Sequence, residues 1–479
     1  MERKSGVLLH ISSLPGDYSC GGFSKSAYGF VDFLKESGFS YWQVLPFTPV
    51  DECNSPYKSF SAFAVNPYFV DLEALYNDGL LTACELNEAK QKTPYSCEYD
   101  RLSRERVPLL IKASKRADGE LKEKIQKFID ENRYIKEFCV FMALKEANGD
   151  REWSLWETDE YSRETYFGWC FIQYEFFVQW ARVKKYANEN GIKIIGDIPI
   201  YVSFDSSDVY FNRSLFLMDK NNRLTDVAGV PPDYFSEDGQ LWGNPLYNWK
   251  ELEKTGFSWW RERLGFALTL FDGVRIDHFR GIESFWAVPG TEKTAKNGKW
   301  VKGPGMKLIK ELKKVAGDKL IIAEDLGDIT EDVIKLVNES GFPGMRVFQF
   351  GFLGGDTIHK PHHYVNNSVC YSGTHDNNTL LGYLWETPED TKRDIMNYCG
   401  CDPLKWNENG CFAIIRTIMA SNAGLTVFPI QDLLGYGSDT RLNVPGRAEG
   451  NWMYRITGEQ LSYIDKNKLR YYNSIYNRI

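Results

Sequence analysis

The sequence lacks any long tract of basic residues and any glycine-rich basic tail, and its 479 residues carry a net charge of −8. Nucleic acids and anionic membranes are therefore poor candidates as partners. The N-terminal segment MERKSGVLLHISSLPG has only a short apolar run, interrupted by His10 and Ser12, so it does not have the pattern of a signal peptide or a membrane span. We expect a cytoplasmic protein that binds neither nucleic acid nor a membrane.

The ten cysteines lack the spacing of a disulfide framework or a zinc ribbon, and the nearest pair, Cys399 and Cys401, is a weak signal. Isolated thiols in a reducing compartment are the simpler interpretation. The sequence also has no GxSxG motif, no P-loop and no GxGxxG after a strand. A serine nucleophile, a nucleotide phosphate and a dinucleotide therefore have no support as parts of the site.

Three histidines, His359, His362 and His363, form an HxxHH cluster whose residue type could ligate a metal ion. The cluster has no adjacent glutamate and lies in a loop that contains a proline. We therefore expect local hydrogen bonds at these histidines, and no metal site.

What the sequence does contain is an ordinary globular composition, 43% hydrophobic and 25% charged, with eight short apolar runs. Helical patterns fill most of the gaps between these runs, which predicts an α/β fold, a (β/α)8 TIM barrel. The runs occupy residues 7–10, 41–50, 192–202, 271–281, 319–325, 345–352, 369–379 and 425–435.

We expect a single barrel domain over residues 1–479, with two large insertions at its C-terminal face. The first, over about residues 70–167, has helical periodicity and no convincing strand. The second, over about residues 206–250, is long and irregular. Its aromatic content favours a functional role, because long loops inside compact domains are usually functional or disordered.

The run FDGVRIDHFRG, residues 271–281, ends in charged side chains. Alternate residues of a strand share a face, so Arg275 and Asp277 would point the same way, and a buried pair of this kind is costly unless it is paired or used. Carboxylates also follow three other runs, at Asp197, Glu324 and Asp376. Barrel active sites are assembled at these strand ends, so the sequence predicts a site there.

Single polar residues in this set have a structural alternative. Asp325 or Asn377 could each be the N-cap of a helix, because short polar side chains accept hydrogen bonds from the first turn. The repetition of carboxylates at several strand ends argues for a functional site over a series of helix caps.

Three carboxylates that converge with an arginine suggest glycoside chemistry by the retaining route. Arg275 would hold Asp277 in its ionised, nucleophilic form, and burial near negative charge would raise the pKa of Glu324 so that it acts as the acid. Asp376 would hold sugar hydroxyls and stabilise a cationic transition state. His278 and His375 would donate hydrogen bonds to substrate oxygens.

The motifs of the chain closely resemble those of the 4-alpha-glucanotransferases, glycoside hydrolase family 77, which belongs to the alpha-amylase clan. The resemblance extends from residue 6 to about residue 452. The matching motifs are GVLLHISSLPG, YWQVLPFTPV, SPYKSFSAFAVNPY, GDIPIYV, VAGVPPDYFSEDGQLWGNP, FDGVRIDHFRG, AEDLG, GTHDNNT and RLNVPG.

The resemblance implies transfer of a glucan segment from one α-1,4-linked chain to the 4-hydroxyl of another, with no metal or organic cofactor. It implies Asp277 as nucleophile, Glu324 as acid/base and Asp376 as transition-state stabiliser, and the loop from Asp233 to Trp242 as a flexible lid. The expected substrate contacts are Ser55, Tyr57, Asp197, Asp233, Trp242, Arg275, His278, Phe350, His375 and Asn443.

Two alternatives remain open at this stage. A hydrolase of the same clan would use the same three carboxylates with water as the acceptor, and a non-catalytic glucan-binding protein would be marked by the loss of one carboxylate. The expected partners are maltooligosaccharides and α-1,4-glucans, and the expected state is a monomer or a weak homo-oligomer.

Overall fold

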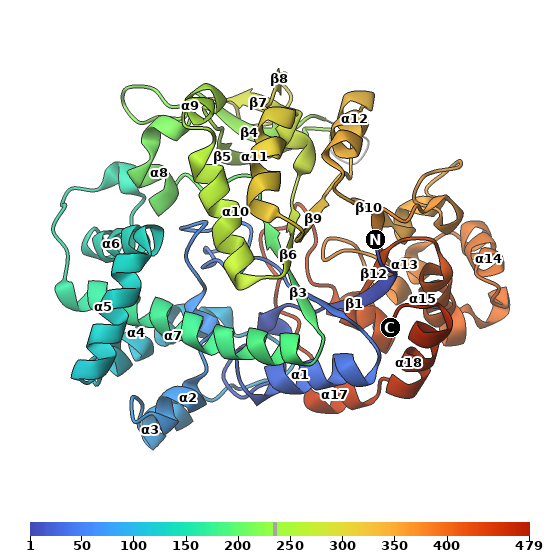
Figure 1. The fold of residues 1–479 in the computed structure, drawn as a ribbon, viewed down its shortest axis with the longest axis horizontal. Coiled ribbons are helices and arrows are strands. Elements are labelled where there is room, and N and C mark those ends of the chain that lie inside the picture. Colours follow the sequence, from blue (N-terminus) through green and yellow to red (C-terminus); the bar gives the residue numbers. More distant parts are fainter. Residues whose placement is uncertain (233–236) are drawn as a thin grey trace.

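The computed structural model describes residues 1–232 and 237–479 and contains a closed barrel of eight parallel strands (Figure 1). Neighbours around the barrel follow the order β1-β12-β11-β10-β9-β6-β3-β2. Each strand overlaps one of the eight predicted runs, so the TIM barrel prediction is confirmed. The barrel strands are β1 (Lys4–Leu8), β2 (Tyr41–Gln43), β3 (Lys193–Ile198), β6 (Gly273–Ile276), β9 (Leu320–Ala323), β10 (Gly344–Val347), β11 (Ser368–Tyr371) and β12 (Leu425–Pro429).

The barrel interior is a packed apolar core of its own. In β9, Ile322 belongs to this inner cluster, whereas Ile321 and Ala323 pack outward into the larger core under the helices. This alternation follows from the two-residue period of a strand. The inner cluster comprises Leu8, Ile195, Ile322, Met345, Val369, Tyr371, Leu425 and Val427.

Helices connect most successive barrel strands, as the sequence predicts. They are α1 (Lys25–Glu36), α7 (Arg163–Glu189), α10 (Ser258–Leu270), α11 (Met306–Ala316), α12 (Glu331–Ser340), α13 (Leu380–Glu386), α14 (Glu389–Tyr398) and α15 (Cys411–Ala420). Three more helices follow the last barrel strand, β12, namely α16 (Ile430–Leu434), α17 (Gly458–Ser462) and α18 (Lys466–Ile475). The connection from β10 to β11 has only short 3-10 turns, among them Phe348–Phe352 and Pro361–His363. No helix in the described ranges is long and apolar enough to cross a membrane.

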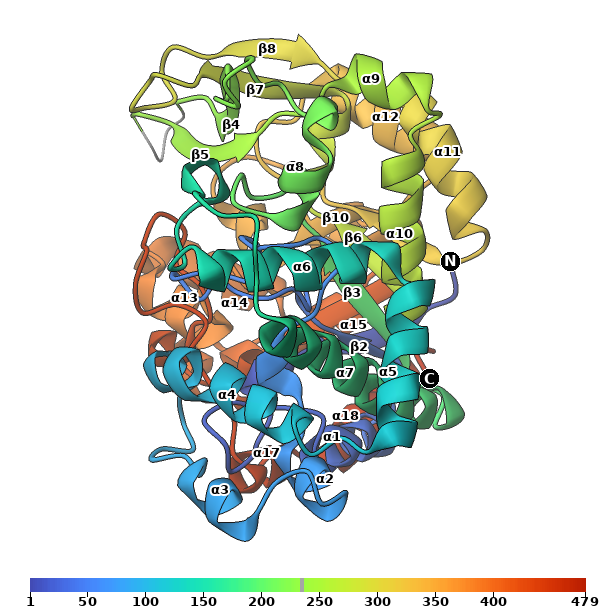
Figure 2. The same ribbon diagram turned by 90° about the vertical axis from the view of Figure 1, so that its left-hand side faces the viewer.

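The first predicted insertion is helical, as expected. Helices α4, α5 and α6 pack against α7, and together they form the side of the molecule that faces the viewer in Figure 2. The helices of this region are α2 (Leu72–Asn77), α3 (Ala83–Glu88), α4 (Tyr99–Ser114), α5 (Gly119–Glu131) and α6 (Arg133–Ala147).

The prediction that residues 206–250 are irregular is wrong. This region contains α8 (Ser207–Phe211), β4 (Asp226–Val230), β5 (Gln240–Pro245) and α9 (Trp249–Lys254). Strands β4 and β5 form a separate antiparallel sheet with β7 (Ser284–Pro289) and β8 (Lys299–Lys302), in the order β5-β4-β7-β8. The sheet lies at the opposite end of the molecule from α2 and α3 (Figure 2).

The two ends of the chain meet beside β1 and β12 (Figure 1) and are joined by Arg478, which is fully buried. Its guanidinium donates hydrogen bonds to the carbonyl oxygens of Met419 at 2.7 Å, Lys4 and Ser421 at 3.0 Å, and Ala423 at 3.1 Å. We expect Arg478→Ala to destabilise the protein by about 3 kcal/mol or more, because several buried acceptors lose a charged donor at once.

The measurement is the urea midpoint of unfolding, compared with that of Arg470→Ala. Arg470 is an exposed arginine of α18 with a single bond, to the carbonyl of Lys35 at 3.0 Å, and we expect its loss to change stability by about 0.5 kcal/mol or less. Equal midpoints for the two variants would contradict the proposed role of Arg478.

Candidate active site

Arg275 of β6 links the ends of two neighbouring strands. Its guanidinium lies 2.7 Å from Oδ2 of Asp197 on β3 and 2.7 Å from Oδ1 of Asp277, which directly follows β6. Asp197 is buried beneath the site, and burial raises its pKa to about 6 despite the opposing charge of Arg275. The arginine thus fixes the position of Asp277 and supplies it with a positive charge, as the sequence predicts.

Glu324 follows β9, the strand that pairs with β6. The register pairs Ile276 with Ala323, so Asp277 and Glu324 occupy neighbouring positions at the two strand ends. The backbone N–H of His278 donates to Oε2 of Glu324 at 2.7 Å, and that of Leu326 donates to Oε1 at 3.0 Å. Burial, together with the charge of Asp277, raises the pKa of Glu324 to about 8. Glu324 is therefore suited to hold a proton at neutral pH.

His278, which directly follows Asp277 and donates its backbone N–H to Glu324, has a left-handed backbone with φ of 48°. Its ring lies edge-on to Trp242, with centroids 4.8 Å apart, and burial lowers its pKa to about 4. A positive φ is uncommon outside glycine, and such residues concentrate at functional sites.

The third carboxylate, Asp376, lies in the loop after β11. Asn443 donates to its Oδ1 at 2.6 Å, and Nε2 of His375 lies 3.3 Å from its Oδ2. Partial burial opposes ionisation, but the charge of His375 and the Asn443 amide outweigh it and hold the pKa of Asp376 well below its usual range. Asp376 is therefore an ionised carboxylate held in a fixed orientation.

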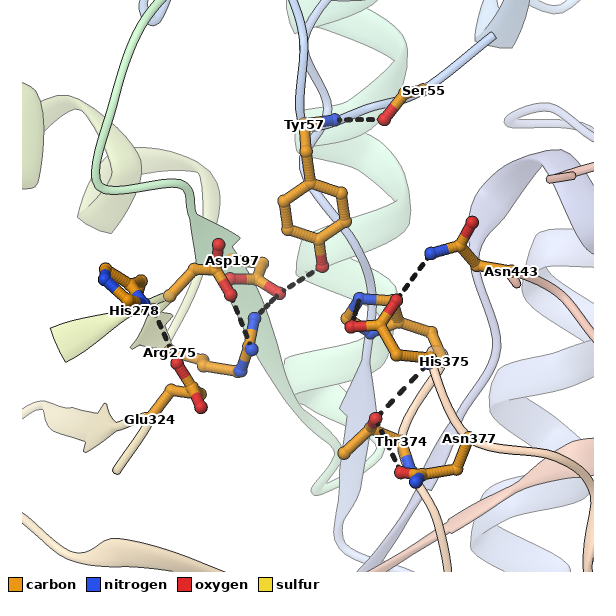
Figure 3. Close-up of polar contacts among 12 residues, drawn as sticks. Ser55, Tyr57, Asp197, Arg275, His278, Glu324, Thr374, His375, Asn377 and Asn443 are labelled. Atoms are coloured by element: carbon orange, nitrogen blue, oxygen red, sulfur yellow. Dashed lines mark hydrogen bonds and ion pairs between the residues drawn. The ribbon is translucent and has the colours of Figure 1, made fainter. Parts of the chain in front are cut away.

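Tyr57 lies between the two groups of charged residues, as Figure 3 shows. Its hydroxyl donates to Oδ2 of Asp197 at 2.7 Å, and its ring stacks on His375 with centroids 5.0 Å apart. The Ser55 hydroxyl accepts a hydrogen bond from the backbone N–H of Tyr57 at 3.3 Å. The loop between β2 and α2 is thus connected to β3 and to the β11 loop through one side chain.

A cleft of about 380 Å³ opens over these residues. It contains charged, amide and aromatic side chains together, which is the mixture that a sugar-binding site requires. Seven of the predicted site residues line it, namely Ser55, Tyr57, Trp242, Asp277, His375, Asp376 and Asn443. Other lining residues include Lys58, Tyr201, Gln240, Asn244, Arg447, Asn451 and Trp452.

The remaining predicted residues lie elsewhere. Asp197, Arg275, His278 and Glu324 are not among the cleft-lining residues, but Asp197 contacts Tyr57, Arg275 contacts Asp277, and Glu324 accepts from the backbone N–H that directly follows Asp277. Phe350 packs edge-on against His359, with centroids 5.6 Å apart, and is not among the cleft-lining residues. The prediction for Asp233 falls outside the described residues, as does part of the predicted lid.

Trp452 lies beside this site but was not predicted from the sequence. Its ring lies 5.9 Å from both Tyr57 and His375, and its backbone has φ of 66°. The sequence NWMY in a glycine-containing stretch marks an aromatic residue in a loop, but nothing in it indicates proximity to the β11 loop.

The helix-cap alternatives are wrong. The Asp325 carboxylate accepts from the backbone N–H of Met345, and Asn377 accepts from the backbone N–H and hydroxyl of Thr374. The three histidines of the HxxHH cluster make local hydrogen bonds, as expected. His359 accepts from Val347, while His362 contacts Tyr398 and His363 contacts Asp356.

Asp432 of α16 was also not predicted from the sequence. It accepts hydrogen bonds from both ends of the loop that carries Asp376. Its Oδ2 accepts from the Ser372 hydroxyl at 2.6 Å and its Oδ1 from the backbone N–H of Leu380 at 2.7 Å. It is 2% exposed, and burial raises its pKa to about 7. Asp432 therefore positions Asp376 and His375 from behind.

We expect Asp432→Ala to lower kcat by up to about 10²-fold with a smaller change in KM, because small displacements of catalytic groups are costly. Ser372→Ala, which removes one of the two bonds and leaves the other, is the matched comparison and should have a weaker effect. Steady-state kinetics of both variants at matched folded fractions make the measurement. Unchanged kcat in Asp432→Ala would rule out the positioning role.

Comparison with known proteins shows what the chain is related to. A family profile described as 4-alpha-glucanotransferase matches residues 9–461. The chain is 43% identical to the 4-alpha-glucanotransferase of Streptococcus pneumoniae over 100% of this chain and 98% of that protein, and 41% identical to that of Thermus thermophilus over 96% of each.

Solved structures agree with this relationship. The amylomaltase of Streptococcus agalactiae in complex with acarbose superposes with a TM-score of 0.95 at 38% identity, over 100% of each chain. The amylomaltase of Corynebacterium glutamicum, at 18% identity and a TM-score of 0.82, covers 100% of this chain and 75% of its own and shares the fold. The chain therefore belongs to glycoside hydrolase family 77, the 4-alpha-glucanotransferases.

Proposed function

We propose that this enzyme moves segments of α-1,4-glucan to the 4-hydroxyl of an acceptor glucan or glucose, by a retaining double displacement through a covalent glycosyl-enzyme. Membership of the family makes the chain a transglycosylase, and the solved relative bound to acarbose supports an α-glucan substrate. The observation that carries the mechanism is the placement of Asp277 and Glu324 directly after two adjacent strands, with Glu324 accepting from the backbone N–H of His278.

Retaining glycosidases hold their two carboxyl groups roughly 5–5.5 Å apart, a separation within reach of side chains at neighbouring positions of adjacent strands. In the first step, an oxygen of Asp277 attacks the anomeric carbon while the glycosidic bond breaks. Glu324 gives its proton to the departing oxygen, and the leaving chain departs as a neutral alcohol. The raised pKa of Glu324 supplies the protonated form that this step needs.

In the second step, the 4-hydroxyl of an acceptor attacks the anomeric carbon of the glycosyl-enzyme. Glu324, now ionised, takes the proton of that hydroxyl, and the ester bond to Asp277 breaks. Both steps develop positive charge on the sugar ring, which the ionised Asp376 in the same cleft stabilises.

The alternative is hydrolysis with the same carboxylates. The aromatic residues of the cleft, Tyr57, Trp242 and Trp452, favour transfer because they offer apolar surface to an acceptor sugar and limit the access of water. The presence of all three carboxylates in one site argues against a role in binding alone.

The test is incubation of the pure protein with maltotriose, with products resolved by length over time. We expect glucose together with maltopentaose and longer chains, and no net gain in reducing ends. Formation of glucose and maltose with an increasing concentration of reducing ends would show that water is the acceptor and that the enzyme is a hydrolase. No change in the substrate would contradict both reactions for this donor.

We further propose that maltooligosaccharides and α-1,4-glucans are the partners of a protein that acts in the cytoplasm as a monomer or weak homo-oligomer. All ten cysteines are free thiols, which fits a reducing compartment. The net charge of −8 gives no basis for binding nucleic acid or an anionic membrane.

A further inference from the structure

The connection between β10 and β11 brings a carboxylate to two neighbouring histidines. One ligand atom from each of Asp356, His362 and His363 lies within 4.8 Å of the other two. Nε2 of His363 is 2.8 Å from Oδ2 of Asp356, and Nε2 of His362 is 3.5 Å from Oδ1 of the same carboxylate. In the sequence the HxxHH cluster has no adjacent glutamate and lies in a loop that contains a proline, but the fold brings the carboxylate of Asp356 to His362 and His363.

Both Nε2 atoms approach one carboxylate, so their ligand directions converge on one region. Ligand atoms around an ion with bonds of about 2.0–2.2 Å are about 3 to 3.5 Å apart, which is close to the spacing of the two N···O contacts. Small side-chain rotations are therefore enough to place all three groups around an ion.

His362 is also oriented from its other side. Its Nδ1 lies 2.9 Å from the hydroxyl oxygen of Tyr398, and its backbone N–H donates to the same oxygen at 3.1 Å. With a proton on Nδ1, the imidazole donates to Tyr398 and presents the lone pair of Nε2 to the carboxylate side. This arrangement, in which the second ring nitrogen is hydrogen-bonded, is the one that metal-ligating histidines adopt.

We propose that Asp356, His362 and His363 form a surface site for a divalent first-row transition ion of the zinc or copper type. Two imidazoles and one carboxylate make up the ligand set, water completes the coordination, and Mg²⁺ and Ca²⁺ do not compete because they prefer all-oxygen sites. The site lies on the β10–β11 connection and takes no part in the glucan chemistry. Its occupation ties Asp356 to the 3-10 turn Pro361–His363 and so restrains residues 356–363.

One neighbouring charge opposes the ion. Nζ of Lys360 lies 4.0 Å from Oδ1 of Asp356, although it also donates to the carbonyl of Gly355 at 2.9 Å. The positive charge of Lys360 weakens the binding of a cation at this site by like-charge repulsion. Lys360→Gln is therefore expected to bind the divalent ion more tightly.

The chain is well suited to the test, because His362 and His363 are its only exposed histidines among six. Thiols also bind these ions, and Cys84 is exposed while Cys53, Cys399, Cys401 and Cys411 are partly exposed, so all measurements use a background in which these five cysteines are serine. Calorimetric titration with Zn²⁺ and with Cu²⁺, and with Mg²⁺ as the control ion, gives affinity and stoichiometry. A thermal melt with and without Zn²⁺ gives an independent readout.

We expect one Zn²⁺ per chain, tighter binding of Cu²⁺ and none of Mg²⁺. Tyr398→Phe should weaken Zn²⁺ about 10–100-fold by removing the partner of Nδ1, and His363→Asn should weaken it at least as much. The rise in melting temperature with Zn²⁺ should vanish in His363→Asn. An affinity that is the same in His362→Gln and His363→Asn as in the background, or no saturable binding below about 1 mM, would overturn the proposal.

Discussion

Asp277→Asn is expected to reduce turnover of maltotriose by more than the roughly 10²–10⁴-fold that acid–base assistance usually accounts for. An amide nitrogen or oxygen does not form the glycosyl ester, so the covalent route is lost and not merely slowed. The asparagine can still accept from Arg275, whose guanidinium lies 2.7 Å from the native carboxylate, so the variant should fold. Product analysis over hours, with a melting curve as a folding check, makes the measurement.

Asp197→Asn is the matched comparison, because Asp197 pairs with the same guanidinium at 2.7 Å but does not line the cleft. Its loss disturbs Arg275 without removing a group that touches the sugar. We expect a much smaller decrease in kcat than for Asp277→Asn. Near-normal activity in Asp277→Asn, or equal losses in the two variants, would remove Asp277 from the role of nucleophile.

The barrel was predictable because each of its strands is marked by a short stretch of the sequence itself. Runs such as 319–325 combine β-branched residues with a charged end, and the helices between them have their own periodicity. The small antiparallel sheet was not predictable in this way. Strands β4 and β5 are short and contain glycine, and β7, the second partner of β4, lies beyond β6 in the chain. The pairing therefore depends on contacts that the sequence does not mark.

Some residues of the site were likewise recognisable from the local sequence, whereas others depend on contacts between distant parts of the chain. Arg275 and Asp277 were recognisable because a two-residue spacing on one strand puts them on one face. Asp432 and Trp452 were not, since each reaches the β11 loop from another part of the chain, one through buried hydrogen bonds and the other through ring contacts. Neither spacing nor residue type distinguishes such a supporting residue from an ordinary buried acid or core aromatic.

Glu324→Gln is expected to lose about 10²–10⁴-fold in turnover of maltotriose, because glutamine donates no proton to the departing glycosidic oxygen. The loss should depend on the leaving group. With an α-maltosyl fluoride donor, fluoride departs without a proton, so the first step should be largely restored and the slow second step should let the glycosyl-enzyme accumulate. Mass spectrometry of the intact protein measures that adduct. Asp277→Asn, which lacks the attacking carboxylate, should form no adduct with the same donor.

The pH profile provides a second test of Glu324. Burial raises its pKa to about 8, and the first step needs the protonated form, so kcat/KM for maltotriose should fall as the pH rises through about 8. The decrease in activity at low pH does not depend on Glu324 and should persist in Glu324→Gln. With the fluoride donor, whose departure needs no proton from Glu324, the fall near pH 8 should be absent in the wild type and in Glu324→Gln alike. A wild-type profile that remains flat well above pH 8, or a fluoride donor that rescues Asp277→Asn in place of Glu324→Gln, would reverse the assignment of acid and nucleophile.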